Sequence, residues 1–348
     1  MTRPSIGLAC NQATQARCLT HDVLARIATV GDLVIETFDE PSSWDAPPPP
    51  NPQADARFIA FAAGLDMVMI SHGAPRITAA ILDAAPRLRF VGELEGDRFA
   101  RRVDVDAATQ RQVKVVDTTH GSSTPVSEWA LGLMLIGLRN AGSLFRRMIA
   151  GEIISPESKR ADPSFLRGEL TGKRVGLIAC GHIGRRLLEL LQPFRCEILV
   201  HDPHAPRVIA DIYAITLTSL NAVMEQSDVV VCLAPLTDET RGMIGASQLA
   251  LLQPGAVFVN VSRGAVVDTA ALLDRLAKGD IIGCLDVFDP EPIPADSPVR
   301  CMDNVFLTPH IAGVTEACGP RFIELMIDEM IRFQADHETR HDLRPRMA

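Results

Sequence analysis

The stretch RVGLIACGHIGRRLLELLQPFRCEILVHD, residues 174–202, decides the fold of the larger part of the chain. It contains an apolar run over 174–179, a glycine-containing turn, a helix-like segment over 183–191 and a second apolar run over 197–201. Nearly continuous apolar runs are typical of strands that are covered on both sheet faces. The stretch therefore predicts a strand–helix–strand unit of a parallel sheet with right-handed crossovers.

The same alternation extends along the chain in both directions. Further apolar runs, each read as a strand between helical patterns, cover 228–234, 256–261, 281–286 and 305–308. A weaker version of the pattern gives candidate strands over 6–9, 33–36, 67–70, 88–91 and 113–116. At roughly 150 residues per domain, 348 residues suggest two domains. The sequence thus predicts two α/β units, of which the one formed by the first part of the chain is the smaller.

Composition and charge exclude several classes of protein. With 47% hydrophobic and 22% charged residues, the chain is globular rather than disordered. A net charge of −9 without a long basic run argues against a nucleic-acid partner. The most apolar stretch, 129–138, is far shorter than the ~20 residues needed to cross a bilayer, and the N-terminus lacks a signal core. We therefore expect no membrane partner and a cytoplasmic protein.

The eight cysteines are scattered, and none forms a Cys-x-x-Cys pair or a zinc-type pattern with histidine. We expect buried free thiols and no metal site.

Two other segments have distinctive signals. Four consecutive prolines, Pro47–Pro50, remove backbone donors and predict an exposed extended loop inserted in the first unit.

Thr124-Pro125 resembles a helix start, so we expect one long helix from Val126 to about Ile149, buried along its apolar part.

The turn after the strand over 174–179 reads Ala-Cys-Gly-His-Ile-Gly, with glycines at 181 and 184. Such a turn presents backbone N–H groups and a helix N-terminus to a pyrophosphate, and Asp202, about 20 residues on, can bind the adenosine ribose. The pattern predicts a Rossmann-type dinucleotide site. Asp202 favours NAD over NADP, because a 2′-phosphate would meet a carboxylate. Ala179 stands where the fingerprint usually has its first glycine, which bears on the tightness of the turn and on cofactor affinity.

Polar residues follow three later strands, each just beyond the carboxyl end. Arg263 follows the run over 256–261, Glu291 follows that over 281–286, and His310 follows that over 305–308. Ligands of doubly wound sheets bind at this edge. The three types suit the reduction of a carbonyl, because imidazole transfers a proton, a carboxylate orients it, and guanidinium binds a carboxylate or polarises a carbonyl oxygen.

Residues 172–313 closely resemble the D-isomer-specific 2-hydroxyacid dehydrogenase family. The resemblance rests on GKRVGLI (172–178), CLAPLTDETRGMIG (232–245), NVSRGAVVD (260–268), LDVFDPEP (285–292) and LTPHIAG (307–313). Residues 103–138 are also similar, and the first ~90 residues match less well. The resemblance implies an NAD-dependent oxidoreductase that transfers a hydride between the nicotinamide and a small 2-hydroxy or 2-keto acid.

Roles can be carried over where the residues match. Arg263, Glu291 and His310 fall on the family's catalytic positions, with His310 as acid/base and Glu291 as its partner. The cofactor positions are Gly181, His182, Ile183 and Gly184 at the pyrophosphate, Asp202 at the adenosine ribose, Val261 and Ser262 beside the nicotinamide ribose, Asp286 at the carboxamide, and Gly313.

The resemblance also implies the domain organisation. Residues 1–118, completed by 320–348, would form a flavodoxin-like substrate domain, and 119–319 the doubly wound NAD-binding domain, with the substrate cleft between them. Family members are usually homodimers joined through the cofactor domain and its long helix, here 126–149.

One departure concerns the loop after the strand over 88–91. Glu93, Glu95 and Asp97 replace much of a glycine-rich loop that receives the substrate carboxylate in the family. Facing the cleft, the acids would repel a carboxylate by about 1–4 kcal/mol per contact. Because charged residues are usually solvated, we expect the three acids to point outward. The neighbouring Arg98 is a candidate to compensate their charge, and the sequence does not fix its direction.

Two other functions fit the same fold. One is an NAD(H)-sensing interaction protein of the C-terminal-binding corepressor type, which has similar site residues and would offer a peptide-binding cleft in the first domain. The other is a formate dehydrogenase, which is disfavoured because that relative carries glutamine where Glu291 stands.

Overall fold

The computed structural model describes residues 3–41, 46–95, 102–162 and 168–343. The chain divides into two compact units: unit 1 comprises Met1–Ser122 and Thr315–Ala348, and unit 2 comprises Ser123–Val314. Each unit contains a parallel β-sheet, which confirms the predicted α/β class. The boundaries drawn from the sequence, 118/119 and 319/320, lie a few residues from these divisions.

Unit 1 contains a five-stranded parallel sheet with strand order β2-β1-β3-β4-β5. Its strands are β1 (Ser5–Cys10), β2 (Asp32–Thr37), β3 (Met67–Ile70), β4 (Phe90–Glu93) and β5 (Lys114–Asp117). Every candidate strand of the first part of the sequence is therefore present. The order reverses beside β1, as in doubly wound folds of the flavodoxin type.

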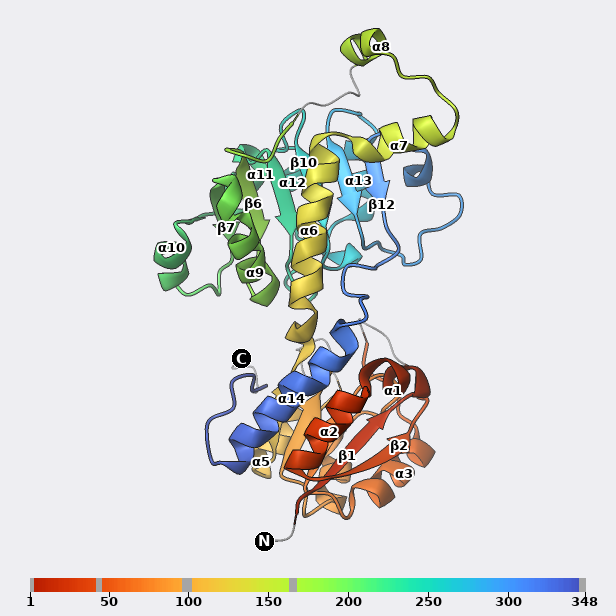
Figure 1. Cartoon of the computed structure of the whole chain (residues 1–348), viewed down its shortest axis with the longest axis vertical. Coiled ribbons are helices and arrows are strands. Elements are labelled where there is room, and N and C mark those ends of the chain that lie inside the picture. The colour runs from red at the N-terminus through yellow and green to blue at the C-terminus, as the bar shows by residue number, and fades with distance from the viewer. Residues whose placement is uncertain (1–2, 42–45, 96–101, 163–167, 344–348) are drawn as a thin grey trace. The chain divides into compact units, whose positions relative to one another are not determined.

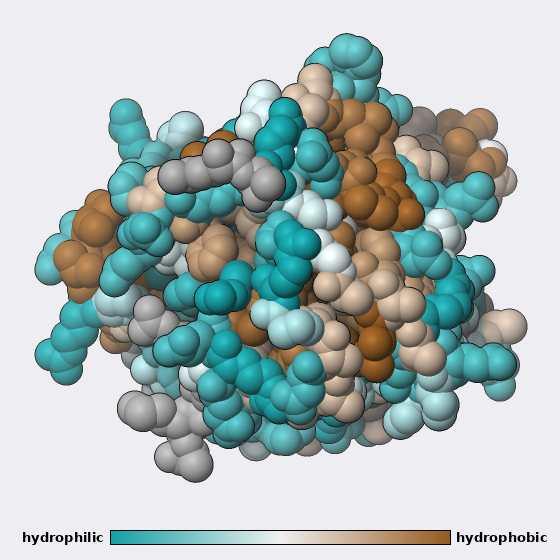
Figure 2. All heavy atoms as spheres, turned by 90° about the horizontal axis from the view of Figure 1, so that it is seen from below, coloured by the Kyte–Doolittle hydropathy of each residue, from teal (hydrophilic) through white to brown (hydrophobic). Residues whose placement is uncertain are grey.

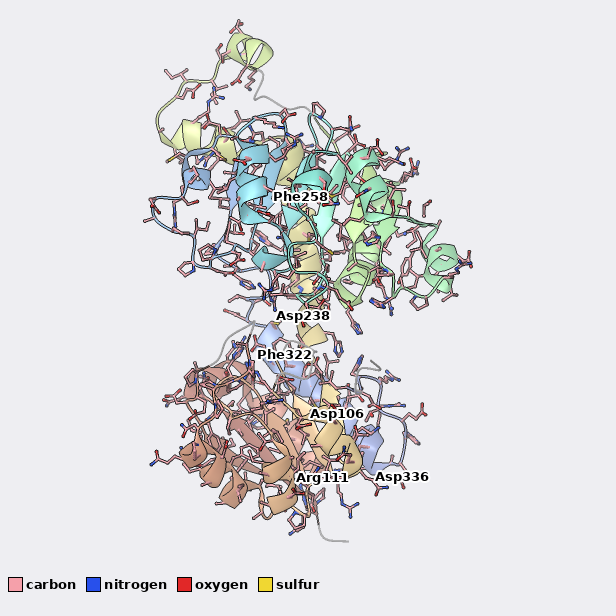
Figure 3. All side chains as sticks on the ribbon, turned by 180° about the vertical axis from the view of Figure 1, so that it is seen from behind. Asp106, Arg111, Asp238, Phe258, Phe322 and Asp336 are labelled. Carbon is pink, nitrogen blue, oxygen red and sulfur yellow. The ribbon has the colours of Figure 1, made fainter. Side chains whose placement is uncertain are left out.

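Helices cover both faces of this sheet (Figure 1). One core packs beneath α1 (Gln12–Cys18), α2 (His21–Val30) and α14 (Cys318–Gln334), and the other beneath α3 (Pro52–Ala62), α4 (Ala79–Ala84) and α5 (Val105–Gln110). Phe322 of α14, labelled in Figure 3, is almost fully buried in the first core. The proline-rich segment lies in unit 1 immediately before α3, and of Pro47–Pro50 only Pro48 is buried.

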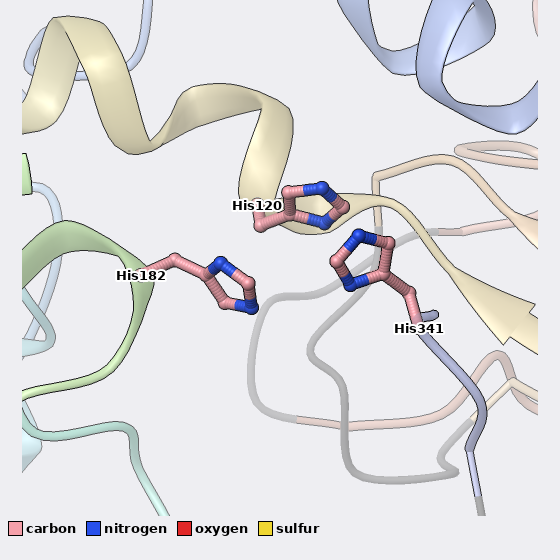
Figure 4. A group of neighbouring side chains, drawn as sticks. All are labelled: His120, His182 and His341. Atoms are coloured by element: carbon pink, nitrogen blue, oxygen red, sulfur yellow. The ribbon is translucent and has the colours of Figure 1, made fainter. Parts of the chain in front are cut away.

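The end of the chain pairs with the outer edge of this sheet. Val116 forms an antiparallel bridge with Asp342, the Asp117 N–H donates to the His341 carbonyl, and Lys114 pairs with Asp342 at 2.9 Å. The ring of His341 lies against that of His120, in the 3-10 turn η1 (Thr119–Ser122), with centroids 3.8 Å apart (Figure 4).

Unit 2 contains a seven-stranded parallel sheet with order β12-β11-β10-β9-β6-β7-β8. Its strands are β6 (Arg174–Ile178), β7 (Glu197–His201), β8 (Thr216–Leu217), β9 (Val229–Cys232), β10 (Val257–Asn260), β11 (Ile282–Leu285) and β12 (Val305–Leu307). All six strands predicted here are confirmed. The two-residue edge strand β8 was not predicted, because it has too few residues to show a period.

Two hydrophobic cores flank the sheet of unit 2. One face packs against α6 (Ser123–Leu138) and α9 (His182–Leu191), with α10 (Val208–Tyr213) at its margin. The other packs against α11 (Leu220–Gln226), α12 (Ala246–Leu249) and α13 (Thr269–Leu276). Phe258 of β10 is fully buried in this second core (Figure 3). Shorter segments are α7 (Ala141–Ile149), α8 (Pro156–Ala161) and the 3-10 turns η2 (Gln192–Phe194), η3 (Gly264–Val266) and η4 (Pro298–Cys301).

The single helix expected from Val126 to Ile149 is wrong in its continuity. The chain breaks between α6 and α7 at Asn140, which adopts a left-handed conformation with φ of 44°. Asparagine tolerates this conformation better than most residues, which allows the chain to turn there. Immediately after the break, Gly142 lies so close to Phe306 that a Cβ atom would be 2.5 Å from its ring.

The face drawn in Figure 2 is mixed, with hydrophilic side chains beside separate apolar patches. Four exposed large apolar side chains of unit 2 lie on and just after α7: Phe145, Met148, Ile149 and Ile153. Within the described ranges, no helix has the length and apolarity required to span a bilayer.

Candidate active site

Three neighbouring strands bring the predicted catalytic residues to one edge of unit 2. β10, β11 and β12 are adjacent and parallel, so their carboxyl ends lie side by side. Arg263 follows β10, Glu291 follows β11 and His310 follows β12. All three roles remain predictions, and the sheet order supplies the framework on which they depend.

Glu291 and His310 are brought into direct contact. The His310 Nδ1 atom lies 2.8 Å from the Glu291 Oε1 atom, and the side chains are 25% and 36% exposed. A carboxylate that accepts the Nδ1 proton fixes the orientation of the ring. This pair has the geometry of an imidazole prepared to exchange a proton through Nε2.

The loop that carries His310 is held by Asp286, which is fully buried. The Asp286 Oδ1 atom accepts hydrogen bonds from Thr308 Oγ1 at 2.5 Å and from the Ile311 N–H at 3.0 Å, and Oδ2 accepts one from the Ala312 N–H at 3.0 Å. The His310 N–H donates to the Asp286 carbonyl. These bonds maintain the backbone of His310 at φ of 54°, a conformation that residues other than glycine rarely adopt. Asp286 is predicted at the nicotinamide carboxamide, and its contacts here are to the loop that carries His310.

The loop of Arg263 packs against the loop that leads to Glu291. A Cβ atom on Gly264 would lie 1.9 Å from the backbone carbonyl of Phe288, so the two loops touch without room for a side chain. The Arg263 Nη1 atom donates to the Ser262 carbonyl at 2.7 Å. The predicted nicotinamide-side residues Val261 and Ser262 are both buried beside it.

The predicted pyrophosphate turn leads directly into α9. Gly181 is the N-cap of α9, and a Cβ atom there would meet nothing within 4 Å, so the space beside it is open. Amides in the first turn of a helix have no intrahelical acceptor and attract anions. His182, Ile183 and Gly184 occupy that turn. Ala179 sits at φ of 75°, which confirms that the turn is formed without its usual first glycine.

Asp202 lies beside this turn, at the end of β7. Its Oδ2 atom accepts the Cys180 N–H at 2.8 Å, and Oδ1 accepts the His204 N–H at 2.8 Å. A carboxylate offers about four lone-pair positions, so both oxygens retain capacity for ribose hydroxyls. The chain's own residues therefore fit a dinucleotide with a free 2′-hydroxyl.

Several polar side chains at this edge were not singled out from the sequence. Asn260 bonds to the loop of Arg263, and Thr308 links Asp286 to the Trp129 indole, whose Nε1 atom is 3.4 Å from Thr308 Oγ1. Asn260 could have been noticed, because it is a polar residue at the end of the otherwise apolar strand Val-Phe-Val-Asn.

The acidic loop of unit 1 differs from expectation. Glu93 is fully buried and pairs with Arg102, whose Nε atom is 3.2 Å from Glu93 Oε1. Glu95 is largely buried and pairs with Arg17 through two contacts, the longer being 3.1 Å from Nη1 to Oε1. The outward orientation was therefore wrong for both acids: each is compensated by an arginine because an unpaired buried carboxylate is unstable. Asp97 and Arg98 lie outside the described residues.

His72, beyond the end of β3, belongs to the same cluster. Its Nδ1 atom lies 3.1 Å from Arg102 Nη2, and its Nε2 atom lies 3.9 Å from Glu95. Burial, reinforced by the positive charge of Arg102, lowers the pKa of His72 to about 4. The ring is therefore neutral at physiological pH.

Comparison with known proteins identifies a matching family and several relatives of this chain. Residues 131–312 match the family described as D-isomer specific 2-hydroxyacid dehydrogenase, NAD binding domain. The chain is 33% identical to D-3-phosphoglycerate dehydrogenase of Methanocaldococcus jannaschii over 72% of its length, but the match covers only 46% of that relative. It is 34% identical to glyoxylate reductase of Thermofilum pendens, over 74% of this chain and 75% of that one.

The fold also has a similar solved structure. A phosphoglycerate oxidoreductase from Rhizobium etli superposes with a TM-score of 0.81 at 22% identity, covering 99% of this chain and 98% of that one. At this identity the likeness concerns the fold alone.

Proposed function

This chain belongs to the D-isomer-specific 2-hydroxyacid dehydrogenase family, and from that premise we propose that it transfers a hydride between NAD and a small 2-hydroxy or 2-keto acid. The contact between His310 and Glu291 is the observation that carries the proposal. A histidine paired through Nδ1 with a carboxylate, at the carboxyl edge of an NAD-binding sheet, suits the proton transfer that accompanies hydride transfer.

Each residue then has a defined task. In the direction of reduction, His310 gives a proton from Nε2 to the keto oxygen, and Glu291 orients the imidazole through Nδ1. Arg263 binds the substrate carboxylate and polarises the keto group. NAD, when bound, supplies the hydride chemistry, whereas the protein aligns the substrate and excludes water.

The corepressor-type alternative gains no support. The relatives described above are named as dehydrogenases or reductases. The buried, ion-paired state of Glu93 and Glu95 also removes the main objection to an acidic substrate, because their charges are compensated within unit 1.

The test is steady-state oxidation of NADH, followed at 340 nm, with a panel of 2-keto acids and with NADPH in parallel. We expect turnover with at least one acid and a preference for NADH, because Asp202 would repel a 2′-phosphate. Formate should not reduce NAD. Absence of turnover with every acid, while NADH binds, would contradict the proposal.

His310→Ala and Arg263→Ala should each lower kcat/KM by about 10²–10⁴-fold, the range typical of a lost acid/base or charge-stabilising group. NADH affinity, measured by fluorescence titration, should persist in both. His21→Ala is the matched control, because this histidine is 96% exposed in unit 1. Full activity in either variant would remove that residue from the mechanism.

We also propose a cytoplasmic homodimer. The exposed apolar residues of α7 support a subunit contact there, because large apolar side chains on a surface commonly mark an interface. The eight free cysteines support a reducing compartment. Cell fractionation would test the location.

A further inference from the structure

Asn260 ends β10, immediately before the proposed nicotinamide-side and catalytic residues, and it is only 1% exposed. Its Oδ1 atom accepts hydrogen bonds from the Ser262 N–H at 3.1 Å and from Ser262 Oγ at 3.2 Å. Its Nδ2 atom donates to the Arg263 carbonyl at 3.2 Å. The partners fix the orientation of the amide, because a backbone N–H can only donate and a carbonyl can only accept.

The loop that Asn260 binds is held on its other side as well. The Ser262 Oγ atom lies 3.4 Å from the buried Cys232 Sγ atom. Gly264 abuts the Phe288 carbonyl so closely that a methyl group could not be inserted. Residues 261–264 are thus held between the Asn260 amide and the segment that leads to Glu291. Arg263 lies within this restrained segment.

We propose that Asn260 is a positioning residue. Through its hydrogen bonds to Ser262 and to the Arg263 carbonyl, it fixes the backbone position from which the Arg263 side chain extends. It makes no contact with substrate in this role. The inference rests on the proposed function, in which Arg263 binds the keto acid. Misplacing a binding group by about 1 Å can cost on the order of 10²-fold in rate, so the effect of losing Asn260 should appear in turnover of the acid.

Asn304 provides the matched control, because its side-chain amide also donates to backbone carbonyls but lies away from the proposed site. The Asn304 Nδ2 atom donates to the carbonyls of Leu276 at 2.9 Å and Ile281 at 2.8 Å, just before β12 begins, at the opposite end of the same sheet. Asn304→Ala should lower the melting temperature and leave kcat/KM unchanged below the unfolding range. Asn260→Ala should lower kcat/KM for the keto acid by about 10–100-fold. NADH affinity should fall by a smaller factor, because only Val261 and Ser262 of its predicted site lie in the affected segment.

Asn260→Asp adds a readout that a purely structural role would not change. The ionised carboxylate retains the acceptor for Ser262 but opposes the Arg263 carbonyl, whereas the protonated acid can donate to that carbonyl. The activity of Asn260→Asp relative to the wild type should therefore rise as the pH falls. A pH-independent ratio, or wild-type kcat/KM in Asn260→Ala, would overturn the proposal.

Failure of the proposed function gives a separate result. If the wild type turns over none of the acids, that function is wrong, and the crystal structure of Asn260→Ala alone decides the positioning role. Displacement of residues 261–264 from their wild-type position would support it, and an unmoved loop would refute it.

Discussion

Ala179 lies in the turn between β6 and α9, the predicted pyrophosphate turn, with a strained backbone. Its φ of 75° lies in the left-handed region, which costs a residue with a Cβ atom about 1–2 kcal/mol. Glycine loses more chain entropy on folding, by roughly 0.5–1 kcal/mol. Ala179→Gly should therefore leave the free energy of unfolding unchanged or raise it by up to about 1.5 kcal/mol.

The control for this change is Ala270→Gly, at an exposed position within α13, which should destabilise unit 2 by roughly 0.5–1 kcal/mol. Chemical denaturation of both variants measures the difference. Equal destabilisation by the two substitutions would show that the left-handed conformation of Ala179 is not a source of strain.

His72 makes stability depend on pH. The pKa of His72 falls from 6.5 to about 4 on folding. Between pH 6.5 and pH 4, His72 therefore binds a proton in the unfolded chain but not in the folded chain. The free energy of unfolding should fall as the pH is lowered from 6.5 to 4, by at most about 3 kcal/mol from this residue. His72→Gln should flatten this part of the curve relative to the wild type.

Urea denaturation at four pH values between 7.5 and 4.5 would check the prediction. His21→Gln, at an almost fully exposed position, serves as the control and should follow the wild type. Parallel curves for the wild type and His72→Gln would show that His72 titrates alike in both states.

Residue identities at the site were accessible from the sequence, but side-chain directions were not. The positions of Arg263, Glu291 and His310 at strand ends followed from apolar runs and turn residues. The burial of Glu93 and Glu95 did not, because it depends on Arg102 and Arg17, which reach them from other elements.

At the scale of elements, α6 offers a matched pair of glycines. A Cβ atom on Gly132 would meet only Trp129, at 3.9 Å, whereas one on Gly137 would lie 2.4 Å from a Val257 methyl group and 3.0 Å from Cys284 Sγ. Gly132→Ala should stabilise the helix by about 0.5–1 kcal/mol through helix propensity. Gly137→Ala should destabilise by roughly 1–3 kcal/mol through overpacking against β10 and β11.

Thermal unfolding followed by circular dichroism would rank the three proteins. The expected order of melting temperature is Gly132→Ala, wild type, Gly137→Ala. A Gly137→Ala variant as stable as the wild type would mean that α6 does not pack on the sheet at this depth.

Strands were predictable because buried parallel strands read as continuous apolar runs, and Met67–Ile70 and Glu197–His201 have the predicted bounds. Helix ends were less so. Just after the break at Asn140, Gly142 packs closely against Phe306, which is far away in the sequence. A propensity pattern over 126–149 contains no record of that contact.

At the scale of the whole molecule, the chain returns to unit 1 through its last helix and through the short segment after it. The last helix was assigned to this unit through the family resemblance. The pairing of Asp342 with Val116 was not foreseen, because the segment is short and polar and its pairing depends on β5 and Lys114. This segment covers the edge of the sheet, which would otherwise present unpaired backbone groups.

The proposed homodimer is tested at the same scale. Phe145 and Met148 on α7 are 64% and 65% exposed, and burying such side chains supplies much of the energy of a protein interface. The wild type should sediment with a mass of twice 37.7 kDa, and Phe145→Glu with Met148→Glu should yield monomers, because a dimer would bury both charges. Ile212→Glu is the control: this residue is 66% exposed on α10, which the resemblance does not place in the contact, so the dimer should persist. A monomeric wild type, or a double variant that remains dimeric, would exclude α7 as the contact.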